Sequence, residues 1–171
     1  MARSTFRAAL AAMTLLAALQ ACATTFPAAS RPTVPRRGGG SAALHPEVRE
    51  LRRLVNEHRR RIGCPPLEWS STLARVAQRH SADMARRGFF GHVNPDGEDP
   101  FERLHAAGVE YAAAAENVAA GHPDAVTVFA AWMRSRGHRR NIERCAFADH
   151  GIGLAENRWT HVFVRSHNSA R

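Results

Sequence analysis

The sequence contains no lysine: all 24 of its basic residues are arginine, against 15 acidic residues. Arginine in place of lysine, together with abundant alanine, is typical of the codon usage of a GC-rich genome rather than of a particular activity. The net charge of +9 favours contact with anionic lipid headgroups or cell-wall polymers. Nucleic-acid-binding motifs are absent from the sequence, and we therefore expect no nucleic acid partner.

The chain also lacks a hydrophobic run long enough to span a bilayer, which needs about 20 residues. Its longest uncharged, mainly apolar run has 12 residues (8–19) and follows Arg3 and Arg7, a pattern typical of a signal peptide. The run ends in "LQAC", which resembles the bacterial lipobox, whose cysteine is lipidated and becomes the new N-terminus. We therefore expect a signal peptide over 1–21 and lipidation of Cys22. Ordinary secretory cleavage nearby is the alternative.

Residues 22–43 show no apolar periodicity, and their Ala, Thr, Pro, Arg and Gly indicate a flexible tether with an r.m.s. reach of about 25 Å. The remaining residues, 44–168, fit one domain. Without the signal peptide, 22 arginines remain against 15 acidic residues, a net charge of +7. We expect an exported monomer. It is either a periplasmic or outer-membrane lipoprotein, attached to a membrane by its lipid, or a secreted protein.

Cysteine is scarce, with three residues in the chain. If Cys22 carries lipid, Cys64 and Cys145 are an even pair in an oxidising compartment, and we expect a disulfide between them. Such a bond closes a loop of about 80 residues and stabilises the fold by about 4 kcal/mol. Two unpaired buried thiols are the alternative, and two cysteines this far apart make a poor zinc motif.

Apolar residues recur at helical spacing in segments that end at a glycine. The predicted helices span residues 46–62, 71–87, 100–107 and 123–136. Residues 109–122 are predicted to be loop and strand, and the segments 151–155 and 159–165 to be strands joined in a hairpin by Glu156-Asn157. His80 lies on the apolar stripe of the second helix, which favours a packed, hydrogen-bonded core residue over a ligand. Helices interleaved with short strands predict an α/β layered domain.

One histidine stands between a hydrophobic pair and a strong turn signal in "FFGHVNPDG", residues 89–97. His92 is either an ordinary surface loop residue or a side chain directed into a site by Phe89 and Phe90, which would then anchor the loop.

Five segments of the chain occur in a familiar order: "LVNEHRRRIGCPPLEW", "HSADMARRGFFGH", "AAENVAAGH", "WMRSRGHRRNI" and "HGIGLA…WTHVFV". Together they resemble bacterial members of the CAP superfamily, which includes cysteine-rich secretory proteins, insect venom antigens and plant pathogenesis-related proteins. The resemblance covers Leu44 to His167. It implies a three-layer α-β-α sandwich, with helices packed on both faces of a small, largely antiparallel sheet.

The resemblance also implies a cleft with two histidines and two acidic residues, which binds divalent metal in several family members. His92 and His138 match the two histidines. Glu116 matches the acid of the family's Gly-Glu-Asn motif, with Ala115 in place of the glycine. Ser135 stands where the second acid is usual, so three of the four polar groups remain.

Two imidazoles and a carboxylate suit Zn²⁺ or Cu²⁺ with water in an open position. Five arginines lie near His138 in the sequence: Arg134, Arg136, Arg139, Arg140 and Arg144. Their positive charge opposes a divalent cation and favours an anionic ligand, although a solvated basic face is the plainer interpretation. Strand alternation places His161 on one face with Trp159 and Phe163, where it either lines the cleft or is a buried, hydrogen-bonded strand residue.

No zincin H-E-x-x-H or G-x-S-x-G nucleophile motif is present in the sequence. We therefore expect an envelope binding module for a small or anionic ligand, such as a lipid or envelope fragment, rather than an enzyme. A metal-assisted, peptidase-like hydrolase using His92, Glu116 and His138 is the first alternative. A structural or adhesive envelope protein, in which both histidines are dispensable, is the second.

Overall fold

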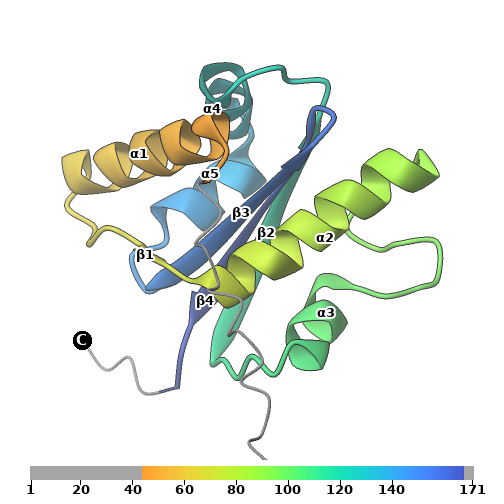
Figure 1. Cartoon of the computed structure of the whole chain (residues 1–171). Coiled ribbons are helices and arrows are strands. Elements are labelled where there is room, and N and C mark those ends of the chain that lie inside the picture. Colours follow the sequence, from red (N-terminus) through yellow and green to blue (C-terminus); the bar gives the residue numbers. More distant parts are fainter. Residues whose placement is uncertain (1–43, 168–171) are drawn as a thin grey trace, which may run out of the picture. The chain divides into compact units, whose positions relative to one another are not determined.

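The computed structural model describes residues 44–167 (Figure 1). The signal peptide, the lipidated Cys22 and the tether predicted over 1–43 lie outside the described residues. Across the described part of the chain, no helix is both long and apolar enough to cross a bilayer.

The helices begin and end largely where local signals predict. Ser70 caps the second helix, where its hydroxyl accepts a hydrogen bond from the Leu73 amide, and Gly88 ends that helix with a left-handed φ of 68°. Asp99 and Glu102 form a reciprocal capping box at the start of the third helix. The described residues contain the helices α1 (Pro46–Arg61), α2 (Ser71–Arg87), α3 (Pro100–Ala106), α4 (Ala125–Arg134) and α5 (Arg136–Glu143).

The segment after Pro123 corrects the prediction of one helix that ends at Gly137-His138. The backbone is extended at Ser135, with φ −87° and ψ 121°, and this residue separates α4 from α5. The change of direction lets Trp132 of α4 and Ile142 of α5 both enter the core. His138 therefore lies in the first turns of a new helix rather than beyond the end of the old one.

The sheet contains the predicted hairpin strands β3 (Asp149–Ala155) and β4 (Arg158–Arg165), together with β2 (Ala113–Ala120) and a short β1 (Glu68–Trp69) that the sequence did not predict. Within the described residues the strand order is β1-β3-β4-β2. β4 pairs antiparallel with both neighbours, and the two-residue β1 pairs parallel with β3. Glu156 and Asn157 turn the hairpin with φ of 44° and 62°, as a type I′ turn requires.

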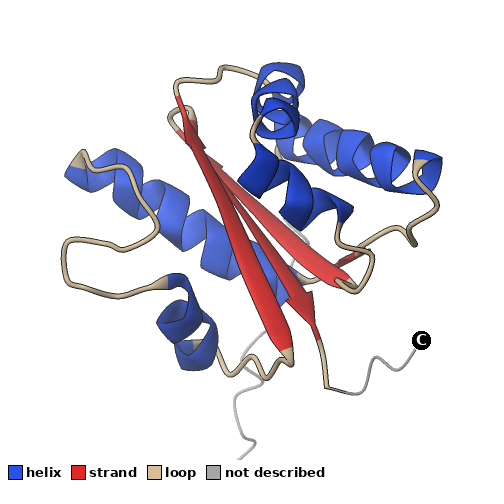
Figure 2. Ribbon diagram, turned by 180° about the vertical axis from the view of Figure 1, so that it is seen from behind, coloured by secondary structure: helices blue, strands red, loops and turns tan. Residues whose placement is uncertain are grey.

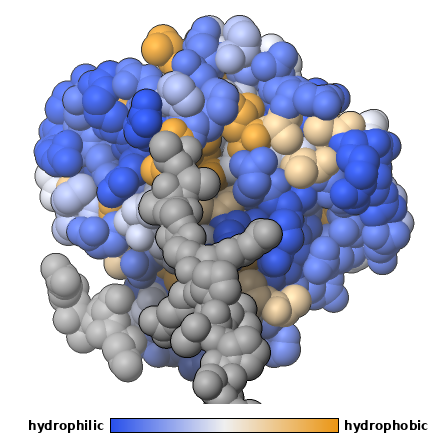
Figure 3. All heavy atoms as spheres, viewed as in Figure 1, coloured by the Kyte–Doolittle hydropathy of each residue, from blue (hydrophilic) through white to orange (hydrophobic). Residues whose placement is uncertain are grey.

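The helices cover both faces of the sheet, α1, α4 and α5 on one face and α2 and α3 on the other (Figures 1 and 2). The alternation predicted for β4 is confirmed: Trp159 and Phe163 pack into the core beneath α1 and α4, while Val162 and Val164 pack against α2. The α-β-α sandwich expected from the resemblance is therefore confirmed. The face shown in Figure 3 is mainly hydrophilic, with hydrophobic residues in small groups.

Two glycines of β3 explain how closely α2 approaches the sheet. A Cβ atom built on Gly151 would lie 2.1 Å from the Ala74 backbone nitrogen, and one on Gly153 would lie 2.3 Å from the Ala77 carbonyl carbon. Any side chain at these positions would displace α2 from β3. The repeated glycine in "GIGLA" is thus a packing requirement of the interface between helix and sheet.

The C-terminal end of α1 is fixed to the segment after α5 by a covalent and a polar link. The expected disulfide between Cys64 and Cys145 is present. Beside it, the buried guanidinium of Arg59 donates to the carbonyl oxygens of Ile142 and Phe147 at 2.9 Å. Burial lowers the pKa of Arg59 to about 10, so this arginine remains charged at neutral pH.

A pair of histidines fills the centre of the face beneath α1. His150 Nδ1 and His161 Nε2 lie 2.9 Å apart in a hydrogen bond, and both residues are fully buried. The His161 ring packs on Phe163, with centroids 3.8 Å apart. Burial, with a smaller effect from Arg52 and Arg59, lowers the pKa of His150 to about 3. Both imidazoles are therefore neutral at physiological pH.

Candidate functional site

The free edge of the sheet brings together residues from both helical layers. Glu116 lies on the edge strand β2 and faces the layer of α2 and α3, whereas its neighbour Asn117 faces α5. His92 approaches from the loop after α2, and its Nδ1 lies 2.9 Å from Glu116 Oε1. His138 approaches from α5 on the other side. The three residues carried over from the family resemblance thus gather at one edge of the sheet, where the resemblance implies a cleft.

The loop that carries His92 is held by its backbone. His80 Nε2 donates to the Gly91 carbonyl oxygen at 2.9 Å, and the Phe89 ring packs edge-on against His80, with centroids 5.8 Å apart. Phe89 and the buried His80 therefore anchor the loop. Phe90, the second proposed anchor, does not anchor the loop, because it is 57 % exposed. Val93 in the same loop is 52 % exposed.

Arg103 of α3 is a central member of the site that sequence reasoning missed. Its Nη2 donates to Glu116 Oε2 at 3.0 Å and to the His92 carbonyl oxygen at 2.8 Å, while Nη1 donates to the Glu98 carbonyl oxygen at 3.0 Å. The Glu116 side chain is only 2 % exposed, so this guanidinium compensates a buried carboxylate. No sequence signal distinguishes Arg103 from the other arginines of the chain.

The pairing of Glu116 with Arg103 determines the state of His92. An ionised carboxylate only accepts hydrogen bonds, so His92 Nδ1 must carry a proton and donate it to Glu116. The other ring nitrogen, Nε2, is then the atom that a ligand can meet, and the His92 side chain is 48 % exposed.

The opposite wall of the cleft is ordered by an amide network. Asn117 Nδ2 donates to the His138 carbonyl oxygen at 3.1 Å, and Asn141 Nδ2 donates to Asn117 Oδ1 at 2.8 Å. Burial lowers the pKa of His138, and the nearby charge of His92 lowers it further. His138 is therefore neutral at pH 7, and His92 is close enough for the two charges to interact.

Two further predicted site residues lie elsewhere in the molecule. Ser135 is partly exposed at the junction of α4 and α5, and its hydroxyl makes no capping hydrogen bond to α5. His161 is fully buried in the core with His150, so it does not line the cleft. This placement matches the alternative of a buried, hydrogen-bonded strand histidine.

The arginines of α5 line a groove of their own, on a different face of the helix from His138. A groove of about 510 Å³ lies among Arg136, Arg139, Arg140, Glu143 and Arg144. Glu143 contacts His58 Nε2 at 2.9 Å, and Arg139 Nε lies 3.8 Å from it. The groove therefore has more positive than negative charge.

The arrangement does not fit a three-ligand metal centre. Across residues 44–167, no three His, Cys, Asp or Glu side chains are arranged to hold an ion. Glu116, the only carboxylate of the set, already binds Arg103 through both oxygens. Zn²⁺ or Cu²⁺ bound at Glu116 would lie next to that guanidinium, and repulsion between the two positive charges opposes its binding.

Comparison with known proteins gives relatives among bacterial surface and extracellular proteins. The chain is 36 % identical over 113 residues to the uncharacterized protein YkwD of Bacillus subtilis strain 168, which covers 65 % of this chain and 44 % of YkwD. It is 30 % identical over 112 residues to the uncharacterized membrane protein YlbC of the same organism. That match covers 66 % of this chain and 32 % of YlbC. The chain thus spans less than half the length of these curated relatives.

Among solved structures, an extracellular protein containing a SCP domain from Bacillus anthracis superposes with a TM-score of 0.68 at 33 % identity, covering 70 % of this chain and 40 % of that one. An outer surface protein of Borrelia burgdorferi superposes with a TM-score of 0.65 at 20 % identity, covering 70 % of this chain and 92 % of that one. At this identity the match shows the fold alone. The sequence model described as "CAP: Cysteine-rich secretory protein family" matches residues 52–164. With the sandwich fold, the edge-strand glutamate and the two flanking histidines, this match shows that the chain belongs to the cysteine-rich secretory protein (CAP) family.

Proposed function

We propose that this CAP domain is an exported binding module that holds a small anionic ligand, with a phosphate or carboxylate group, in the arginine groove of α5, next to the edge where His92, Glu116 and His138 gather. The observation that carries the proposal is the pairing of Glu116 with Arg103. This ion pair neutralises Glu116, the carboxylate that contacts His92. The excess positive charge on this side of the sheet is that of the α5 arginines, in the groove that they line.

The α5 arginines supply the chemistry that an anion needs. A guanidinium offers paired N–H donors that match the oxygens of a phosphate or carboxylate. Arg136 and Arg140 have no ion-pair partner among the described residues. The same positive charge opposes a divalent cation.

The test is a calorimetric titration of the chain with glycerol phosphate, with neutral glycerol as the matched ligand. We expect the phosphate to bind and the glycerol not to bind, with affinity that falls as salt rises. The double variant Arg136→Gln/Arg140→Gln should weaken binding about tenfold or more. The control Arg49→Gln/Arg75→Gln removes equal charge from α1 and α2, outside the arginine groove, and should leave affinity unchanged.

Equal affinity of both double variants would show that only net charge matters and would overturn the arginine groove as the site. Zn²⁺ or Cu²⁺ held by His92, His138 and Glu116 stays a prediction, and metal-assisted hydrolysis depends on it. A thermal-shift titration separates the two ideas. Stabilisation by either ion that is lost in His92→Ala and in His138→Ala would favour the metal site over the anion site.

We also propose that the exported chain is anchored to a membrane through a lipid on Cys22. The support is the "LQAC" sequence after an apolar run of signal-peptide length. Labelling cells with radioactive palmitate should mark the wild-type chain and leave Cys22→Ala unmarked. A labelled Cys22→Ala chain would contradict the anchor, and an unlabelled wild type would support plain secretion.

A further inference from the structure

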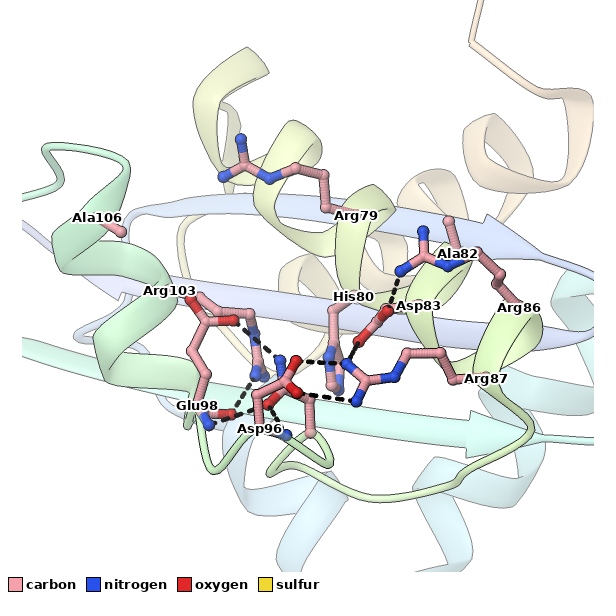
Figure 4. Close-up of a pocket in the computed structure, with 11 residues that line it drawn as sticks. Arg79, His80, Ala82, Asp83, Arg86, Arg87, Asp96, Glu98, Arg103 and Ala106 are labelled. Atoms are coloured by element: carbon pink, nitrogen blue, oxygen red, sulfur yellow. Dashed lines mark hydrogen bonds and ion pairs between the residues drawn. The ribbon is translucent and has the colours of Figure 1, made fainter.

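A second pocket lies behind the wall that carries His92. It is a cavity of about 510 Å³ between α2, α3 and the loop that joins them, and Figure 4 shows the side chains around it. Its size is that of a small-molecule site. The lining is mostly polar and charged, which points to a polar ligand.

Ion pairs within the lining fix the shape of this pocket. Arg87 Nη2 donates to Asp96 Oδ1 at 3.0 Å, and Arg87 Nη1 lies 3.6 Å from Asp83 Oδ2. Arg86 also pairs with Asp83. Residues 83, 86 and 87 share one face of α2 because they repeat at helical spacing. These contacts join α2 to the loop and satisfy both aspartates.

Two charged groups of the lining remain available. Arg79 has no ion-pair partner among the described residues. In the same part of the chain, the Glu98 carboxylate accepts a single hydrogen bond, from Asn94 Nδ2 at 3.1 Å. In the view of Figure 4, Arg79 and Glu98 lie on opposite sides of the pocket. The pocket therefore offers a positive group on one side and a negative group on the other.

The inner wall between them has an unmatched donor and an unmatched acceptor. His80 is 1 % and Arg103 6 % exposed, yet His80 Nδ1 and Arg103 Nε have no hydrogen-bond partner among the described residues. His80 Nε2 donates to the Gly91 carbonyl oxygen, so Nδ1 of the neutral ring is an acceptor. Burial lowers the pKa of His80 and keeps that ring neutral. Arg103 Nε–H is a donor.

We propose that this pocket is a second binding site, which shares Arg103 with the cleft, and that it takes a short peptide with free ends. The peptide carboxylate pairs with Arg79 and its ammonium group with Glu98. A peptide bond supplies both groups that the inner wall lacks: its N–H donates to His80 Nδ1 and its carbonyl oxygen accepts from Arg103 Nε. A free amino acid has the two charges but no peptide bond, and a simple anion leaves Glu98 unpaired.

The site is tested by titrating the isotope-labelled chain with alanyl-alanine and following backbone amide resonances by NMR. We expect saturable shifts confined to residues 79–106, with a Kd of about 1 mM or lower. Acetylating the amino end or amidating the carboxyl end of the dipeptide should each weaken binding about tenfold, because each removes one charge-assisted contact. Free alanine should bind more weakly than the dipeptide.

Two variants and a matched control locate the contacts. Arg79→Gln and Glu98→Gln should each raise the Kd about tenfold, since charge-assisted hydrogen bonds are the strong ones. Arg75→Gln removes the same charge one turn earlier on α2, where Arg75 donates to Thr72 outside the pocket, and should leave the Kd unchanged.

Several results would overturn the proposal: no shifts up to about 10 mM dipeptide, equal binding of the capped dipeptides, or equal effects of Arg79→Gln and Arg75→Gln. Shifts confined to α5 would assign the dipeptide carboxylate to the arginine groove and would likewise refute this pocket. Because the glycerol phosphate site is located by substitutions in α5 and the dipeptide site by substitutions at Arg79 and Glu98, either site can fail while the other stands.

Discussion

The buried His150–His161 pair should make the fold sensitive to mild acid. In the unfolded chain each imidazole binds a proton as the pH falls below about 6.5. In the folded protein, burial holds the pKa of His150 at about 3, and burial with the nearby His150 holds the pKa of His161 well below 6.5. The unfolded state therefore binds more protons, so the free energy of unfolding decreases as the pH drops through the range from 6.5 to 3.

The size of the effect follows from the slope of about 1.4 kcal/mol per pH unit for each proton. Between pH 7 and pH 4.5, His150 alone should lower the free energy of unfolding by about 2.5 kcal/mol. His161 should add to this loss. Small domains have about 5–15 kcal/mol of stability in total, so the loss is a substantial fraction.

Urea unfolding at pH 7, 6, 5 and 4.5 measures this slope. His150→Gln should reduce the decrease by about 2.5 kcal/mol, since the amide does not titrate. His105→Gln, at an exposed position on α3, should keep the wild-type slope. A wild-type stability that stays flat over this range would refute the reasoning. So would an equal slope in His150→Gln, even if that variant were less stable at pH 7.

Three other features of the fold, namely the glycine packing, the disulfide and the buried ion pair, are tested by substitution and urea unfolding. Gly153→Ala should lower the free energy of unfolding by about 1–3 kcal/mol or more, because its Cβ would overlap the α2 backbone. At Gly137 of α5 a Cβ would meet nothing within 4 Å, so Gly137→Ala should raise the free energy of unfolding by about 0.5–1 kcal/mol. The reverse order of the two stabilities would contradict the packing of β3 against α2. Cys64→Ser/Cys145→Ser should lower the free energy of unfolding by about 4 kcal/mol, because the disulfide joins cysteines that are 81 residues apart in sequence. An unchanged urea midpoint would argue against the bond. Arg103→Gln should cost about 3–5 kcal/mol because it leaves a buried carboxylate unpaired. Adding Glu116→Gln should recover part of that loss, and strictly additive effects would refute the pairing.

Much of the fold could be predicted because its signals are local. Capping residues and glycines mark the ends of α1, α2 and α3, and the period of two in "WTHVFVR" separates the two faces of β4. β1 could not be predicted, because two residues carry no periodicity and Glu68–Trp69 becomes a strand only by pairing with β3, some 80 residues later. The break at Ser135 was also missed, since two buried helical faces, rather than a proline or glycine, require it.

The site was predictable only in part for the same reason. His92, Glu116 and His138 were found through a resemblance to a family, because 24 and 22 residues of chain separate them and no local pattern connects them. Arg103 has no family motif and no distinctive neighbours, so only the fold shows that it neutralises Glu116. That contact shows that Glu116 is already paired with a cation, which no sequence pattern indicates.

The side chains beside the cleft also bear on how this sheet avoids joining another. An edge strand exposes backbone groups that can pair with a strand of a second molecule and start aggregation. On β2, the carbonyl oxygens of Glu116 and Val118 already accept hydrogen bonds from Asn141 and Trp132. At the opposite edge, β1 offers only two residues. One edge is thus blocked by side chains of α4 and α5 and the other is too short to extend, so the break at Ser135, which positions those two helices, also protects the chain against strand-to-strand association.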